Sequence, residues 1–151
     1  MAKRGIAMRL ARESKNIQDN YPDLQLEIVD EAKFIWRVSF TMVEGTVYAG
    51  ETFTLQFKFD DKYPFEAPEV MFVNTPPLHE HVYSNGYICL STLSKDWTPA
   101  LQTSQVVISI ISMLASADEK KKPDDDDTSV AFMNRLGSPK KVTWVFHDDK
   151  C

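Results

Sequence analysis

One cysteine in this chain has neighbours that suit nucleophilic chemistry. Cys89 lies three residues after Gly86, ten residues after His79 and eight after His81. A cysteine reacts as its thiolate, which needs access for the substrate and a local field that supports the negative charge. A cysteine without such neighbours is better interpreted as a small buried hydrophobe. We therefore interpret Cys89 as a candidate nucleophile.

The same three side chains raise the question of a metal site. Structural zinc is bound by four ligands, and His79, His81 and Cys89 supply three. The sequence has no C-x-x-C motif that would add to them. We expect no metal site, and we interpret Cys151, which has no comparable surroundings, as an ordinary terminal thiol.

Cys89 belongs to a series of four motifs. In chain order they are Tyr63-Pro64-Phe65-Glu66-Ala67-Pro68, His79-Glu80-His81, Asn85-Gly86-Tyr87-Ile88-Cys89-Leu90 and Trp97-Thr98-Pro99-Ala100-Leu101. The series resembles the active-site region of the ubiquitin-conjugating enzymes, whose pattern is Y-P-F-x-x-P, H-P-N, S/N-G-x-I-C-L and W-x-P-A-L. One motif departs from that pattern, because His79-Glu80-His81 stands where the family has H-P-N.

The resemblance implies a role for each residue around the cysteine. Cys89 would accept ubiquitin as a thioester and pass it to an amine, while His79 and Asn85 would support the active-site segment structurally. His81 takes the place of the family's asparagine, whose amide supports the oxyanion formed during transfer. An imidazole N–H can also donate a hydrogen bond to an oxyanion. His81 is therefore a candidate catalytic residue, and a solvent-facing loop residue without a catalytic role is the alternative.

Two surfaces for partner proteins follow from the same resemblance. The positions that contact RING or U-box ligases in the family are Phe65, Trp97, Pro99 and Ala100 here. Plain loop packing is the alternative, although the Pro99-Ala100 pair beside Trp97 is unusually apolar for a surface loop.

Two arginines of the first helix form the second surface. Arg9 and Arg12 match basic residues that dock the ubiquitin-activating enzyme, with an ordinary solvated helix face as the alternative. The expected partners are thus ubiquitin, its activating enzyme, a ligase and protein substrates. No cofactor is expected, since ATP is used by the upstream activating enzyme.

The chain also departs from the family in how it would handle the incoming amine. Many members carry an acid two residues after the cysteine and another in the facing loop, where this chain has Ser91 and Lys120-Lys121-Lys122-Pro123-Asp124. An α-amine has a pKa of about 7.7–8.0 and a lysine about 10.4, so far more of the α-amine is unprotonated near neutral pH. A site without the lysine-deprotonating acids is better suited to an α-amine.

These departures and the closing segment resemble the W-type branch of the family, which attaches ubiquitin to substrate N-termini. That segment has the pattern W-x-x-x-H-D-D-x-C, beginning at Trp144. Trp144 and Phe146 are expected to contact a substrate's disordered N-terminus, and packing over a bare helix is the alternative. The branch usually has proline at the position of Glu80, which places the loop geometry in question.

The elements that would position these residues follow from periodicity. We expect α+β architecture: an N-terminal helix, a four-stranded antiparallel meander, an active-site loop, a central helix and a shortened, mobile C-terminal region. The expected ranges are a helix over 2–19; strands near 24–28, 34–42, 53–59 and 70–72; an irregular segment over 76–100; a helix over 106–114 with capping residues at 103–105; a solvated charged loop over 118–127; a short helix over 128–136; and a flexible tail over 137–151.

Composition and net charge narrow the class of protein further. The chain has 151 residues and 43% hydrophobic residues, which indicates one domain, residues 1–151, with a packed core. A net charge of −5 argues against a nucleic-acid-binding protein. The longest apolar stretch is too short to span a bilayer, and the N-terminus has no secretory pattern. We expect a cytoplasmic and nuclear protein.

Three other functions stay open at this point. The chain could conjugate ubiquitin to lysines, conjugate another ubiquitin-like modifier, or act as a catalytically weak scaffold with this fold. The presence of Cys89 argues against the scaffold.

Overall fold

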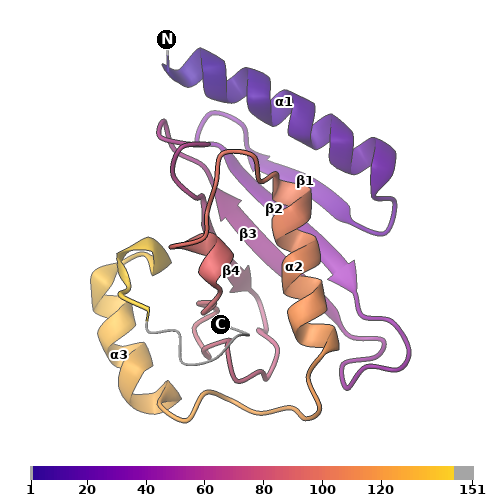
Figure 1. Ribbon diagram of the computed structural model, residues 1–151, viewed down its shortest axis with the longest axis vertical. Coiled ribbons are helices and arrows are strands. Elements are labelled where there is room, and N and C mark those ends of the chain that lie inside the picture. Colours follow the sequence, from indigo (N-terminus) through magenta and orange to yellow (C-terminus); the bar gives the residue numbers. More distant parts are fainter. Residues whose placement is uncertain (1, 145–151) are drawn as a thin grey trace.

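The computed structural model describes residues 2–144 and shows a single antiparallel sheet with helices at both of its ends (Figure 1). The elements are α1 (Ala2–Asn20), β1 (Gln25–Asp30), β2 (Ile35–Thr41), β3 (Thr52–Lys58), β4 (Glu69–Val73), α2 (Thr103–Ala115) and α3 (Asp126–Leu136), with 3-10 turns at Ser91–Leu93 and Pro139–Lys141. Strand order in the sheet is β1-β2-β3-β4. The predicted α+β fold and its meander are confirmed.

The core lies between one face of the sheet and α2. Alternate residues of β2 and β3 point to this face because side chains alternate along a strand, and Trp36, Val38 and Phe40 pair there with Phe57, Leu55 and Phe53. Val107, Ile110 and Leu114 of α2 are fully buried against them. Burying each side chain of this size contributes about 1.5–3 kcal/mol.

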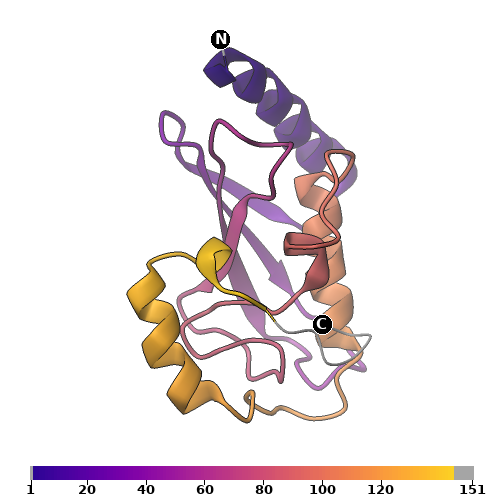
Figure 2. The ribbon, with the colours of Figure 1, turned by 60° about the vertical axis from the view of Figure 1, so that its left-hand side comes forward.

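Helix α1 covers the opposite end of the molecule from α3, as two views agree (Figures 1 and 2). Ile6, Leu10 and Ile17 form an apolar stripe along this helix and are buried. One carboxylate, Glu13, is buried on the same side of the helix with only 3% of its surface exposed.

Two predicted helix starts differ from the structure. Helix α2 begins at Thr103 with Gln102 as its N-cap, whose backbone N–H donates to Oε1 of Gln105 at 2.8 Å. Helix α3 begins at Asp126, inside the segment predicted to be a solvated loop, and Asp126 is buried. That part of the prediction is wrong because the carboxylate of Asp126 finds a backbone donor, Ser84 N–H, at 2.8 Å. Gly137 ends α3 with a φ of 77°.

The start of the predicted flexible tail is attached to the sheet. The Ser138 hydroxyl donates to Glu69 of β4 at 2.8 Å, and Pro139 is buried. The tail prediction placed these residues in free chain because a lone serine gives no sign of a partner far away in the sequence. Phe146 and Cys151 lie outside the described residues. Over the part of the chain that the structure describes, no helix is both long and apolar enough to cross a bilayer.

Candidate active site

Cys89 sits on one strand of a short hairpin that sequence periodicity did not reveal. Val82 and Ile88 form an antiparallel bridge, and the Cys89 N–H donates to the carbonyl of His81 at 2.8 Å. Val82 and Ile88 are buried in the core. Because successive residues alternate across a strand, His81, Tyr83 and Cys89 share the other face of the hairpin. Pairing of the two strands therefore brings the side chains of His81 and Tyr83 to the same groove as Cys89.

The turn of this hairpin is pressed against β4. Gly86 has a φ of 92°, and its carbonyl accepts from the Phe72 N–H at 2.9 Å. A Cβ atom at Gly86 would lie 2.1 Å from the Phe72 carbonyl oxygen, so only glycine fits this approach. Asn85 closes the turn by accepting from the Tyr87 N–H at 3.1 Å, and its amide donates to Asn134 of α3 at 3.0 Å. These contacts fit the structural role expected of Asn85.

His79 connects α2 with the backbone that carries the cysteine. Its Nδ1 accepts from the His81 N–H at 3.0 Å, so the ring proton lies on Nε2, which faces the Met113 carbonyl at 3.3 Å. The His81 peptide extends this series of hydrogen bonds, because its carbonyl accepts from the Cys89 N–H. His79 thus fixes the position of Cys89 through one intervening peptide, in agreement with a structural role.

The side chain of His81 is buried beside the cysteine and does not face solvent. His81 is 9% exposed, lines the same groove as Cys89, and has its Nε2 3.8 Å from Oε1 of Glu80. The exposed alternative considered from the sequence does not describe this position. His81 thus brings to the groove of Cys89 an imidazole ring, whose N–H is a donor of the kind that stabilises an oxyanion.

Four residues that sequence reasoning missed bind the hairpin to α3, two on the hairpin, Tyr83 and Ser84, and two at the start of the helix, Asp125 and Asp126. The Tyr83 hydroxyl donates to both oxygens of Asp125 at 2.9 and 3.1 Å, and Asp126 accepts from the Ser84 N–H. Burial and, to a smaller extent, the hydrogen bond to Asp125 raise the pKa of Tyr83, so this hydroxyl keeps its proton and stays a donor. The sequence feature that could have revealed these contacts is the run of aspartates at the start of a predicted helix. Carboxylates at that position cap the helix and interact favourably with its dipole.

A groove of about 930 Å³ leads to Cys89. It is bounded by the hairpin, by residues 121–125, by α3 and by residues 141–144. The Trp144 ring lies 5.8 Å from the Tyr83 ring, which brings this predicted contact residue to the site. Lys121 and Lys122 also line the groove and bring positive charge to the side where a thiolate would need support.

Cys89 itself is only 6% exposed. The groove is the route by which a second protein segment would reach this residue.

The residues expected to bind a ligase lie on two neighbouring loops. Phe65 is 79% exposed, and Pro99 and Ala100 are exposed. Trp97 is half-buried, and its indole N–H donates to the Pro64 carbonyl at 2.8 Å, which joins the two loops. Trp97 therefore supports this surface from beneath.

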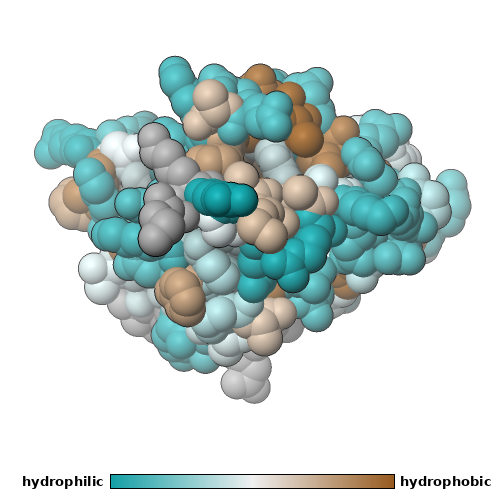
Figure 3. All heavy atoms as spheres, turned by 90° about the horizontal axis from the view of Figure 1, so that it is seen from above, coloured by the Kyte–Doolittle hydropathy of each residue, from teal (hydrophilic) through white to brown (hydrophobic). Residues whose placement is uncertain are grey.

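The two arginines expected to dock the activating enzyme differ. Arg12 is exposed on α1, whereas Arg9 is half-buried and bonded to Glu13 and to the Leu101 carbonyl. Viewed from the α1 end, the surface is largely hydrophilic with separate hydrophobic patches (Figure 3).

Comparison with known proteins agrees with this geometry. Residues 9–143 match the family described as "Ubiquitin-conjugating enzyme". The chain is 45% identical over 144 residues to a probable ubiquitin-conjugating enzyme E2 W of Dictyostelium discoideum, covering 95% of each chain. It is 55% identical over 115 residues to the ubiquitin-conjugating enzyme E2 W of Caenorhabditis elegans, covering 76% of this chain and 74% of the relative.

A solved structure supports the same conclusion. The crystal structure of a ubiquitin conjugating enzyme E2 from Agrocybe aegerita superposes with a TM-score of 0.77 at 39% identity, covering 83% of this chain and 92% of that one. The match over most of the chain, together with the groove that ends at Cys89, shows that this protein belongs to the ubiquitin-conjugating enzyme family and is similar to its W-type members.

Proposed function

We propose that Cys89 accepts ubiquitin from the activating enzyme and passes it, with a RING or U-box ligase, to the α-amino group of a substrate in the cytoplasm and nucleus. In the first step the Cys89 thiolate attacks the carbonyl of the activating enzyme's thioester, and that enzyme's thiol leaves. In the second step the amine attacks the new thioester, an amide forms, the amine loses a proton, and the Cys89 thiolate leaves. The groove that Cys89 lines together with Trp144 is the observation that supports this proposal.

The backbone and side chains beside the cysteine suit both steps. The hydrogen bonds from Met113 through His79 and the His81 peptide hold the Cys89 backbone in place. The His81 ring is then positioned to donate to the oxyanion of each tetrahedral intermediate. A single donor of this kind typically contributes about 10²–10³ in rate.

The carboxylates near the groove favour an α-amine. Position 91, two residues after the cysteine, is serine. Asp125 already accepts from the Tyr83 hydroxyl and from the Ser129 hydroxyl at 2.6 Å, and Asp124 lies 3.6 Å from the Lys121 ammonium. These carboxylate oxygens are therefore already engaged by donors of the protein itself. A lysine ammonium gains little help with deprotonation here, whereas an α-amine needs little.

The shape of the groove suits an extended chain. Trp144, which packs near Tyr83, and residues 121–125 all line it. The resulting channel is open, so a disordered N-terminus can lie along it with its amine at Cys89. Phe146, beyond the described residues, is proposed to add a second apolar contact to that segment.

The test is discharge of the reduced, ubiquitin-charged protein onto three acceptors: a peptide with a free α-amine, the same peptide N-acetylated, and free lysine. We expect discharge onto the first acceptor alone. A variant truncated before Val142 should charge normally and lose much of this preference, because it lacks Trp144. Equal discharge onto the acetylated peptide would refute α-amine specificity and leave the conjugating activity intact.

A further inference from the structure

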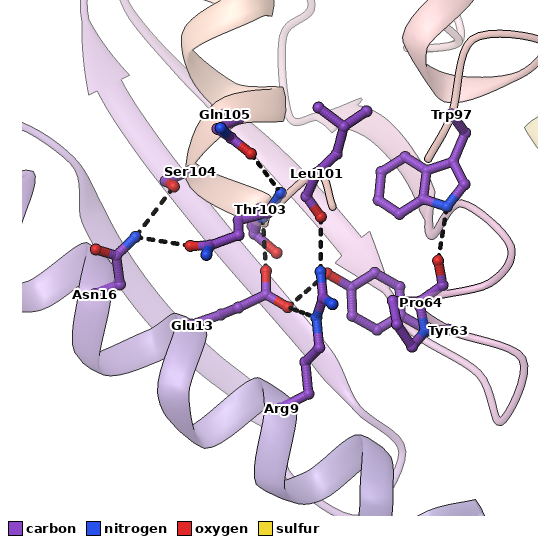
Figure 4. Close-up of polar contacts among 11 residues, drawn as sticks. Arg9, Glu13, Asn16, Tyr63, Pro64, Trp97, Leu101, Thr103, Ser104 and Gln105 are labelled. Carbon is purple, nitrogen blue, oxygen red and sulfur yellow. Dashed lines mark hydrogen bonds and ion pairs between the residues drawn. The ribbon is translucent and has the colours of Figure 1, made fainter. Parts of the chain in front are cut away.

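A buried carboxylate far from the thiol joins three separate parts of the fold. Glu13 of α1 accepts from Arg9 Nε at 2.9 Å, from the Tyr63 hydroxyl at 2.6 Å and from the Thr103 N–H at 2.7 Å (Figure 4). Thr103 is the first residue of α2, so a side chain of one helix caps the N-terminus of another.

Arg9 extends these contacts to a second loop. Its Nη2 donates to the Leu101 carbonyl at 2.8 Å, and its guanidinium lies 5.3 Å from the centre of the Tyr63 ring. Arg9 and Glu13 are one turn apart on α1, and together they hold one residue of each loop.

The residues that are held adjoin the exposed apolar positions. Tyr63 lies two residues before Phe65, and Leu101 directly follows Ala100. The Trp97–Pro64 hydrogen bond closes the connection between the two loops. The spacing of Phe65 from Ala100 is therefore set by contacts that begin at one carboxylate.

We infer that Glu13 is a positioning residue for ligase binding: it holds the two apolar loops in the relative arrangement that a ligase recognises. This inference rests on the proposed function, in which Phe65 and Ala100 contact the ligase. Glu13 contacts neither Cys89 nor any residue that lines the groove through the described hydrogen bonds. Its effect on discharge of the charged protein should therefore appear only when a ligase is present.

The chain offers a matched control on the same helix. Lys15 and Asp19 form an ion pair at 2.9 Å with the same four-residue spacing as Arg9 and Glu13, but both are exposed, and their described side-chain hydrogen bond joins them only to each other. Asp19→Asn removes a carboxylate charge from α1 in a place where nothing is positioned.

The experiment measures discharge of charged protein with and without a purified RING domain that stimulates the wild type. Glu13→Gln should raise the KM for the RING domain about tenfold, with kcat and ligase-independent discharge of the charged protein within twofold of wild type. Asp19→Asn should change none of these. Tyr63→Phe removes a single donor to Glu13 and keeps the ring, so it should raise the same KM by a smaller factor. This variant tests the inference if Glu13→Gln does not fold.

A double variant separates positioning from a general loss of structure. If Glu13 acts through the loops, adding Tyr63→Phe to Glu13→Gln should have little further effect on the KM, because coupled residues are not additive and the Tyr63 hydroxyl donates to Glu13. Equal loss of ligase-independent discharge, or full additivity of Glu13→Gln and Tyr63→Phe, would overturn the inference. If Phe65→Ala itself leaves ligase stimulation unchanged, the proposed ligase surface is wrong and the inference falls with it; if only the Glu13 and Tyr63 variants are silent, the inference alone fails.

Discussion

Gly86→Ala should weaken both the fold and the charging of Cys89. The added Cβ would lie 2.1 Å from the Phe72 carbonyl oxygen, which is backbone and cannot rotate away. The hairpin must therefore move off β4, and the Phe72 N–H bond to the Gly86 carbonyl must lengthen or break. Since Cys89 is on the same hairpin, the displacement reaches the reactive residue.

The magnitude can be built from three contributions. A non-glycine residue at positive φ costs roughly 1–2 kcal/mol, forced backbone shifts in a packed site cost about 1–3 kcal/mol, and a lost hydrogen bond costs about 0.5–1.5 kcal/mol. The variant should lose on the order of 3–6 kcal/mol of unfolding free energy by these figures. Gly45→Ala is the matched control, because Gly45 has a φ of 87° and nothing within 4 Å of its Cβ position. It should lose only the first contribution.

Urea unfolding of the two reduced variants measures the difference, and a single-turnover charging assay reports on the site. Gly86→Ala should charge more slowly even at a temperature where it is fully folded, whereas Gly45→Ala should charge as wild type. Equal destabilisation of the two variants would refute the reasoning, since the close approach to β4 would then cost nothing.

Three further predictions concern the thiol, the loops and a buried phenol. Cys89→Ser should give a stable oxyester or no adduct with ubiquitin on a non-reducing gel, while Cys151→Ser charges normally; failure of the Cys151 variant alone would contradict the site. Phe65→Ala and Ala100→Asp should keep charging and abolish ligase-stimulated discharge, and a loss of charging in both would indicate a folding role. Burial, with Glu51 and Glu80, raises the pKa of Tyr48 to about 12, so the native state alone retains this proton above a pH of about 10. Between about pH 10 and 12, the unfolding free energy should therefore fall faster with pH in wild type than in Tyr48→Phe, by about 1.4 kcal/mol for each pH unit. Identical slopes for the two proteins would exclude this explanation.

Local periodicity was sufficient to predict most of the fold. Alternation over β2 and β3 is strict because one face is buried and the other carries paired polar groups such as Ser39 and Thr54, 2.8 Å apart. The apolar stripe of α1 and the stop at Gly137 have equally local causes. Each of these features depends on residues within a few positions of one another.

The site was less predictable because its contacts join distant segments. Cys89 was identified from its motif, but the hairpin that presents it has too few residues to show a period. The bonds from Tyr83 to Asp125 and from Glu13 to Thr103 span 42 and 90 residues. The sequence of a charged run predicts solvated aspartates, because it does not show that the fold brings hydrogen-bond donors from distant segments to Asp125 and Asp126.

The hairpin that carries Cys89 also covers the outer edge of β4. Tyr87 bridges to Met71, and the Phe72 N–H is satisfied by Gly86. An uncovered strand edge is a template on which another chain can pair. The segment that presents the nucleophile therefore protects the sheet from self-association, and damage that releases the hairpin would remove the activity and expose a β edge at the same time.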